Sequence, residues 1–106
     1  MTSATAQAVA LRAAISAHRA EIDQVLARHH ARDPHLFGSV ARGDAGDHSD
    51  IDLLVELDPD GGNELLRVAA LTEELSRVLG TRVEVVAPSL LRHGVSAAAT
   101  ADLVAL

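Results

Sequence analysis

The stretch FGSVARGDAGDHSDIDLLVEL, residues 37–57, decides the fold because it joins a glycine-containing turn to an apolar strand. Gly38 and Gly43 have the spacing of a phosphate-binding P-loop, but an aspartate follows the second glycine where a P-loop requires lysine. The stretch then reaches Asp50 and Asp52 at the start of an apolar run. These features leave open a phosphate site, a metal site, a surface turn, or two of these together.

The segment DIDLLVEL, residues 50–57, is predicted to form a strand because it alternates and is partly β-branched. Successive side chains of a strand point to opposite faces, so the segment divides into two sets. One set is Ile51, Leu53, Val55 and Leu57, and the other is Asp50, Asp52, Leu54 and Glu56. We therefore expect one apolar face packed on helices and an opposite face with two carboxylates side by side.

A third carboxylate, Glu84, lies in the segment TRVEVVAP, residues 81–88, which is predicted to form another strand. If the two strands pair in the right register, Glu84 joins Asp50 and Asp52 on the open face. Glu56 is a poorer candidate, since four residues of strand place it roughly 13 Å from Asp52. Three carboxylates repel one another unless a cation lies between them. Their oxygens suit Mg²⁺, and two such ions can clamp both oxygens of a phosphoryl transfer.

Residues just before the strand could meet the phosphates. Gly38 lets the backbone approach closely, and Ser39 is expected at a helix start, where free N–H groups face an anion. Ser39 could equally be a plain helix cap, and both roles are compatible. Arg42 could add positive charge near the phosphates or form a surface salt bridge. Ser49 is expected to cap the turn, because no His–acid pair is placed to activate it as a nucleophile.

The composition of this 106-residue chain fits one small domain and excludes several kinds of site. There is no Cys, which excludes disulfides and thiolate zinc sites. All nine basic residues are Arg, which excludes a Walker A lysine and a lysine–nucleotide adduct. Phe37 is the sole aromatic residue and the net charge is −6, so we expect no binding to bulk nucleic acid.

Periodicity and chain breakers predict an α/β domain with the order α, β, short α, β, α, β, α. The expected elements are a helix over 4–30 ended by Pro34, a strand over 35–38, a short helix starting at Ser39, a strand over 50–57, a helix from cap Asn63 to cap Gly80, and a strand over 81–88. The tail is ambiguous. Gly94 interrupts it, its Ala-rich centre could be helical, and 103–106 could be a short last strand or simply the chain end.

Other features are expected to be structural. A zinc site is disfavoured for His29, His30 and His35, which are expected at a solvated helix end. The segment beginning DPDGG fails as a calcium loop, because Ala69 stands where glutamate is required, so a turn is expected.

The leucine and valine stripe over 65–79 is expected in the core, although Leu66, Val68 and Leu90 could leave an apolar patch for a partner. No signal peptide or membrane segment is visible, so the cytoplasm is the expected location.

Gly38-Ser39, ten residues, and then Asp50-x-Asp52 resemble the signature of the polymerase β-like nucleotidyltransferase superfamily. The local sequence is most similar to the minimal nucleotidyltransferases, and the similarity extends roughly over residues 10–95. This resemblance implies a small mixed sheet with helices on one face. It also implies a single minimal nucleotidyltransferase domain over 1–106, with 1–8 and 96–106 flexible or contacting a partner.

The resemblance further implies an activity. Minimal nucleotidyltransferases include antitoxins that are paired with HEPN-type RNase toxins, in modules of the type VII kind, and that move AMP from ATP to a toxin tyrosine. It implies nucleotide binding by Gly38, Ser39, Asp50 and Asp52, with Arg42 as an added candidate, and metal binding and catalysis by Asp50, Asp52 and Glu84. The implied cofactors and partners are two Mg²⁺ ions, ATP and a toxin protein that could form a hetero-oligomer with the chain.

The sequence departs from the family pattern at two places. Glu84 stands where the family usually has Asp, and the tail from His93 is less charged than usual. Two rival functions remain open: an antitoxin that neutralises its toxin by binding alone, and a small-molecule nucleotidyltransferase that modifies a compound such as an aminoglycoside.

Overall fold

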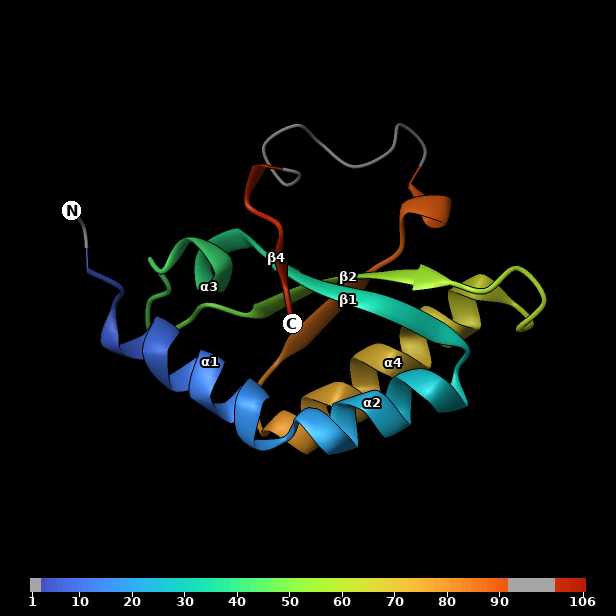
Figure 1. Ribbon diagram of the computed structural model, residues 1–106, viewed down its shortest axis with the longest axis horizontal. Coiled ribbons are helices and arrows are strands. Elements are labelled where there is room, and N and C mark those ends of the chain that lie inside the picture. The colour runs from blue at the N-terminus through green and yellow to red at the C-terminus, as the bar shows by residue number, and fades with distance from the viewer. Residues whose placement is uncertain (1–2, 92–100) are drawn as a thin grey trace.

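A four-stranded mixed sheet organises the protein. The computed structural model describes residues 3–91 and 101–106 (Figure 1). The strands are β1 (Ala31–Phe37), β2 (Ile51–Leu57), β3 (Val83–Val86) and β4 (Val104–Ala105). They lie in the order β3-β2-β1-β4. β1 is antiparallel to β2 and β4, whereas β2 and β3 are parallel, so the predicted mixed sheet is confirmed.

Three helices cover one face of the sheet (Figure 1). They are α1 (Ala6–Ala17), α2 (Arg19–Arg28) and α4 (Glu64–Leu79). The short helices α3 (Gly38–Arg42) and η1 (Pro88–Leu90) follow β1 and β3. Ile51, Leu53 and Val55 are fully buried and belong to the core formed with the helices. The predicted apolar face of the strand is therefore confirmed.

The predicted single helix over 4–30 is wrong, because the chain bends at His18. His18 ends α1 and precedes α2, with φ −106° and ψ 17°. A straight helix of this length would extend about 40 Å, whereas a seven-residue strand extends only about 23 Å. The bend keeps Ile15 of α1 and Ile22 of α2, which are both buried, over the same short sheet.

The strand predicted over 35–38 starts earlier, at Ala31, and ends at Phe37. Its pairing with β2 shifts register between Arg32 and His35, and Asp33 between them has φ 53°. Proline cannot donate a ladder hydrogen bond and is tolerated in a strand at such irregular positions. The prediction that Pro34 ends the helix is therefore wrong, because α2 ends at Arg28 and Pro34 lies inside the following irregular strand.

Helix α4 has the predicted caps. The side chain of Asn63 accepts a hydrogen bond from the Leu66 N–H at 3.0 Å, and Gly80 ends the helix with φ 66°. Leu71, Leu75 and Leu79 are buried along one face.

The first turn of α4 differs from the predicted core stripe. Leu65 and Leu66 are 67% and 69% exposed, so the core prediction is wrong at Leu65, whereas exposure was the alternative left open for Leu66. The buried position one turn before Leu71 belongs to Arg67 instead. Its guanidinium donates to the Asp58 carbonyl from Nη1 at 3.0 Å and from Nη2 at 2.9 Å. Arg67 thereby connects α4 to the turn that follows β2. The sequence predicted the turn but not this contact.

The C-terminal residues return to the sheet. β4 pairs with β1 through His35–Ala105 and Leu36–Val104, so the alternative of a short last strand is confirmed. The helix considered for the Ala-rich centre of the tail falls largely outside the described residues. At the other end, α1 includes residues 6–8, and Ala8 is fully buried. A single domain over 1–106 stays a prediction. None of the helices described is long and apolar enough to cross a bilayer.

Candidate active site

The parallel pairing of β2 with β3 brings the candidate site together. Asp52 lies opposite Glu84 in the ladder, and Ile51 lies opposite Val83. The Ile51 N–H donates to the carbonyl of Arg82 at 3.0 Å, so the two strands remain in register where they begin. The sequence analysis required a particular register of these two strands to bring Glu84 beside Asp52. The structure has this register.

Gly38 lies against Asp52 because β1 also pairs with β2. Phe37, the last residue of β1, lies opposite Asp52 in the antiparallel ladder. Gly38 follows with φ 73°, and a Cβ atom at this position would collide with the Asp52 carboxylate. The close approach and the left-handed backbone together require glycine here. The beginning of α3 is thereby held beside the acidic residues.

Ser39 does not cap α3. The helix begins at Gly38, its N-cap position is Phe37, and no side chain makes a capping hydrogen bond there. The cap prediction is wrong because left-handed Gly38 already turns the chain into the helix, which makes Ser39 the second helical residue. Its predicted role in phosphate binding stays a prediction.

Arg42, at the end of α3, is held by two carboxylates. Its Nε lies 3.1 Å from Asp44 Oδ2, and its Nη1 lies 3.1 Å from Asp102 Oδ2. These hydrogen bonds, first that with Asp44 and then that with Asp102, raise the pKa of Arg42. Of the two roles left open for Arg42, the structure contains the surface salt bridge. Phosphate binding would require Arg42 to leave both partners.

The surroundings of Asp52 disfavour its ionised form. Burial raises the pKa of Asp52 above its ordinary value, the charges of Glu84 and Asp50 raise it further, and Arg42 opposes the shift. Burial and like charges raise the free energy of such a carboxylate when it is ionised. A bound cation would offset both the cost of burial and the repulsion.

The donor set fits Mg²⁺ in chemistry, because it consists of carboxylate oxygens from Asp50, Asp52 and Glu84. In the part of the chain that the structure describes, however, no three His, Cys, Asp or Glu side chains gather closely enough to hold one ion. Asp50 is turned toward Arg82, with 3.6 Å between its Oδ2 and the arginine Nε. A cation bound by Asp50 would compete with this arginine for the carboxylate. The assignment of the three residues as metal ligands stays a prediction.

Comparison with known proteins identifies the family. Residues 20–104 match the nucleotidyltransferase domain. The chain belongs to this family. The nucleotidyltransferase is 35% identical to the protein adenylyltransferase MntA of Thermococcus cleftensis over 82 residues. These residues make up 77% of this chain and 78% of that protein. The predicted family and enzyme class are thus confirmed.

Solved structures agree with the fold. The nucleotidyltransferase is 41% identical to a protein assigned as a minimal nucleotidyltransferase, with a TM-score of 0.64 over 76% of this chain and 80% of that chain. A crystal structure of a toxin–antitoxin with AMP-PNP gives a TM-score of 0.55 at 24% identity, over 68% of this chain and 58% of that chain. The second likeness shows the fold alone. The predicted polymerase β-like, minimal type is confirmed by the first.

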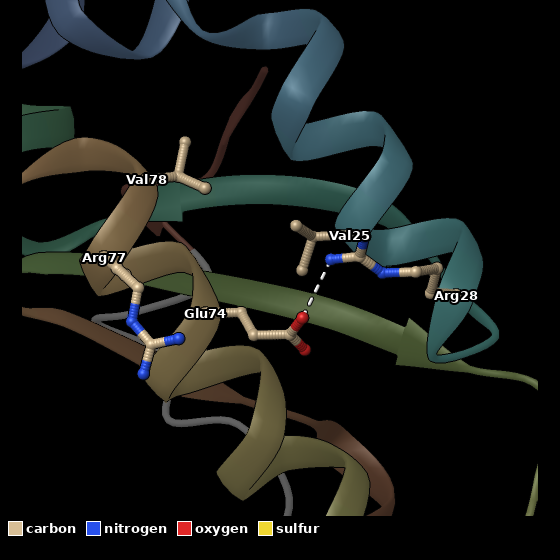
Figure 2. A pocket seen from close by; sticks show the side chains of 5 residues that line it. All are labelled: Val25, Arg28, Glu74, Arg77 and Val78. Atoms are coloured by element: carbon tan, nitrogen blue, oxygen red, sulfur yellow. Dashed lines mark hydrogen bonds and ion pairs between the residues drawn. The ribbon is translucent and has the colours of Figure 1, made fainter.

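The nucleotidyltransferase also has a groove of about 230 Å³ between α2 and α4, which Figure 2 shows from close by. Arg28 of α2 and Glu74 of α4 form an ion pair across it at 2.8 Å. A hydrogen bond with His29 lowers the pKa of Glu74. This carboxylate already has two partners, and the groove lies on the helical side of the sheet. We therefore assign the groove to packing between the helices, and His29 to this contact rather than to a zinc site.

Two residues of the site were missed by sequence reasoning. Arg82 had a usable signal, because strand alternation already placed it on the same face as Glu84. Asp102 had none, since its contact with Arg42 joins residues that are 60 positions apart. Ser49, in contrast, is where it was expected, and its Oγ accepts from the Gly46 N–H at 2.8 Å.

Proposed function

We propose that this nucleotidyltransferase is an antitoxin that transfers AMP from ATP to a tyrosine of a cognate HEPN-type RNase toxin. The observation that carries the proposal is the pairing of Asp52 with Glu84 on the sheet face opposite the three long helices, with Gly38 packed against Asp52. This arrangement provides acidic residues next to a backbone turn, as transfer of a phosphoryl-linked group requires.

The relatives support a protein as the acceptor. The similar Thermococcus protein is named a protein adenylyltransferase, and it resembles this chain over more than three quarters of both lengths. The same fold occurs in a toxin–antitoxin crystallised with AMP-PNP, an analogue of ATP. The name of the Thermococcus protein supports AMP transfer to a protein, and the toxin–antitoxin structure supports ATP as the donor and a toxin as the partner in a hetero-oligomer. Such a reaction draws on cellular ATP, so we propose a cytoplasmic location.

In the proposed reaction, the tyrosine oxygen forms a bond to the α-phosphorus of ATP and the bond to the β-phosphate oxygen breaks. Pyrophosphate leaves, and the tyrosine proton is lost to solvent. Asp50 and Asp52 would hold the ion that carries the triphosphate, and Asp52 and Glu84 would hold the ion nearest the tyrosine. Bound Mg²⁺ would neutralise phosphate charge and activate the hydroxyl.

The protein's own groups position the reactants in this scheme. Gly38 would let the backbone approach the triphosphate, and its close packing on Asp52 keeps the start of α3 beside that carboxylate. Ser39, the second residue of α3, would meet the same phosphates. Because Asp52 contributes to both predicted ion positions, its loss should be the most damaging single change in the site.

The test is transfer of label from ATP carrying a labelled α-phosphate to the product of the adjacent gene, in the presence of Mg²⁺. We expect the partner to be labelled by the wild type and not by the Asp50→Ala, Asp52→Ala double variant. Glu56→Ala is the matched control, because it removes an exposed carboxylate from the same face of β2 without touching the site. An unlabelled partner would contradict the proposal.

Toxin neutralisation separates this function from its rivals. If binding alone neutralises the toxin, the double variant should still protect cells. If a small molecule is the acceptor, label should appear on a compound such as an aminoglycoside and not on protein. We expect the double variant to lose protection while it still binds the toxin.

A further inference from the structure

We propose that Arg82 is a further catalytic residue of this site. While no cation is bound, its guanidinium partners Asp50; once cations take that place, it turns to an anionic oxygen of the reacting phosphates. The proposal deepens the transfer of AMP from ATP proposed above and rests on it for its second step. The first step, the exchange of partners at Asp50, needs neither ATP nor a toxin.

The position of Arg82 follows from the sheet register. Glu84 lies opposite Asp52, so the residues two places earlier on the parallel strands, Arg82 and Asp50, lie on the same face. The four residues form a block with three carboxylates and one guanidinium. Asp50 and Arg82 lie immediately before the first paired residues of the two strands, Ile51 and Val83, and their side chains are in contact.

The contact between Arg82 and Asp50 is suited to exchange. The Nε and Oδ2 atoms are 3.6 Å apart, and the Arg82 side chain is 77% exposed. A solvated pair of this length is weak. A divalent ion bound by Asp50 would both outcompete the guanidinium and repel it, since the two carry charge of the same sign.

Arg42, the arginine favoured from the sequence, is far less available. Its Nε and Nη1 are both within 3.1 Å of carboxylates, those of Asp44 and Asp102. Arg82 has a single ion-pair contact among the described residues, and that partner, Asp50, is the residue predicted to be taken over by a cation. Cation binding therefore frees Arg82 and leaves the two partners of Arg42 in place.

A freed guanidinium next to the predicted ligands would add positive charge where phosphate oxygens accumulate negative charge. Arginine offers several donors in a planar fork that matches phosphate geometry, and it keeps its charge at any physiological pH. Electrostatic groups of this kind act mainly in the transition state of phosphoryl transfer. The effect of losing Arg82 should therefore appear in kcat more than in KM.

The first experiment measures binding of Mn²⁺ alone to the full chain, without nucleotide, by electron paramagnetic resonance. Arg82→Gln should bind Mn²⁺ about threefold to tenfold more tightly than the wild type, because a competing positive charge is gone. Arg82→Lys should stay close to the wild type. Arg77→Gln is the matched control: it removes an arginine that is 74% exposed and paired with a glutamate on α4, and it should leave Mn²⁺ affinity unchanged.

The second experiment measures AMP transfer to the partner under steady-state conditions. Arg82→Gln should lower kcat about 10-fold to 100-fold, with the KM for ATP within about threefold of the wild type, and Arg82→Lys should recover part of the loss. Tighter ion binding combined with slower transfer is a result that a purely structural role would not give. Circular dichroism should show an unchanged fold, since the side chain is exposed.

Weaker Mn²⁺ binding by Arg82→Gln would overturn the proposal, because it would mean that Arg82 holds Asp50 ready for the ion. An unchanged kcat would overturn the phosphate contact. If the wild type fails to label any partner while Arg82→Gln still binds Mn²⁺ more tightly, the proposed function is contradicted but the exchange at Asp50 is supported.

Discussion

Asp52 of β2 and Glu84 of β3 lie directly opposite each other in a parallel ladder, on the face of the sheet opposite the buried residues Ile51, Leu53 and Val55. Neighbouring strands are about 4.8 Å apart, so two ionised carboxylates at these positions repel each other. Together with burial, this repulsion raises the pKa of Asp52. A fold that only needed stability would gain from a neutral residue at either position, which is why the pair indicates a function.

Glu84→Gln should lower the rate of AMP transfer by about 100-fold, the size expected when one preorganised electrostatic group is lost at a reacting centre. Glu84→Asp restores the carboxylate with one methylene fewer and should retain at least the wild-type rate. The measurement is the initial rate of label transfer at saturating ATP and Mg²⁺. Full activity of Glu84→Gln would remove Glu84 from the site, and Glu56→Gln serves as the control.

Asp52→Asn should stabilise the protein at pH 7 in the presence of EDTA. A raised pKa means that the native state binds the proton more tightly than the unfolded state, so stability falls as pH rises above the ordinary value of 3.8 and through the raised value. The advantage of Asp52→Asn should therefore shrink as pH is lowered and vanish below about 3.8, where both states of the wild type are protonated.

Urea unfolding curves at several pH values measure this difference. Added Mg²⁺ should reverse the order at pH 7, because the ion stabilises the ionised wild type and finds fewer oxygens in the variant. Glu56→Gln is again the matched control on the same strand face. If Asp52→Asn were less stable than the wild type at pH 7 in EDTA, the ionised Asp52 carboxylate would not destabilise the native state, and the prediction would be wrong.

The fold could be predicted from sequence where local pattern and tertiary packing agree. The alternation in β2 and the two caps of α4, Asn63 and Gly80, have short-range causes, and the structure has them as expected. The bend at His18 could not be predicted, because it depends on the length of a sheet whose strands all follow the helix in the sequence. Arg67 was also missed, since a buried arginine is recognisable only when its carbonyl partners are known.

The candidate site could be predicted as a set of residues but not as an arrangement. Spacing identified Asp50 and Asp52, and alternation put Glu84 in phase with them. The ion pair of Asp50 with Arg82 depends on side-chain geometry at the start of the two strands. The anchoring of Arg42 by Asp102 depends on the return of the C-terminal segment, which no local pattern specifies.

Arg67→Ala should destabilise the protein by about 2–4 kcal/mol, because it removes charge-assisted hydrogen bonds and leaves the Asp58 carbonyl without these donors in a partly buried place. The cost should appear as a lower urea midpoint. Transfer activity per folded molecule should stay unchanged, since Arg67 lies on the helical side of the sheet. Arg77→Ala on the same helix, an exposed position, should change stability by no more than about 0.5 kcal/mol. Equal effects of the two variants would contradict the structural role given to Arg67.

Gly38→Ala should impair both stability and transfer, for two separable reasons. At φ 73° an alanine is strained by about 1–2 kcal/mol, and its Cβ collides with the Asp52 carboxylate. Gly80 has nearly the same backbone angle, φ 66°, and a Cβ added there would meet nothing within 4 Å, so Gly80→Ala carries the strain without the collision.

Both variants should therefore lose about 1–2 kcal/mol in urea unfolding, whereas only Gly38→Ala should also displace Asp52 and lose at least about 10-fold in kcat. Binding of Mn²⁺ without nucleotide should weaken in Gly38→Ala but not in Gly80→Ala. Because no phosphate is present in this measurement, weaker binding would show that the Asp52 carboxylate has moved. If the two variants transfer AMP equally well, the close packing of Gly38 on Asp52 contributes nothing to the site, and the glycine is needed only for the turn into α3.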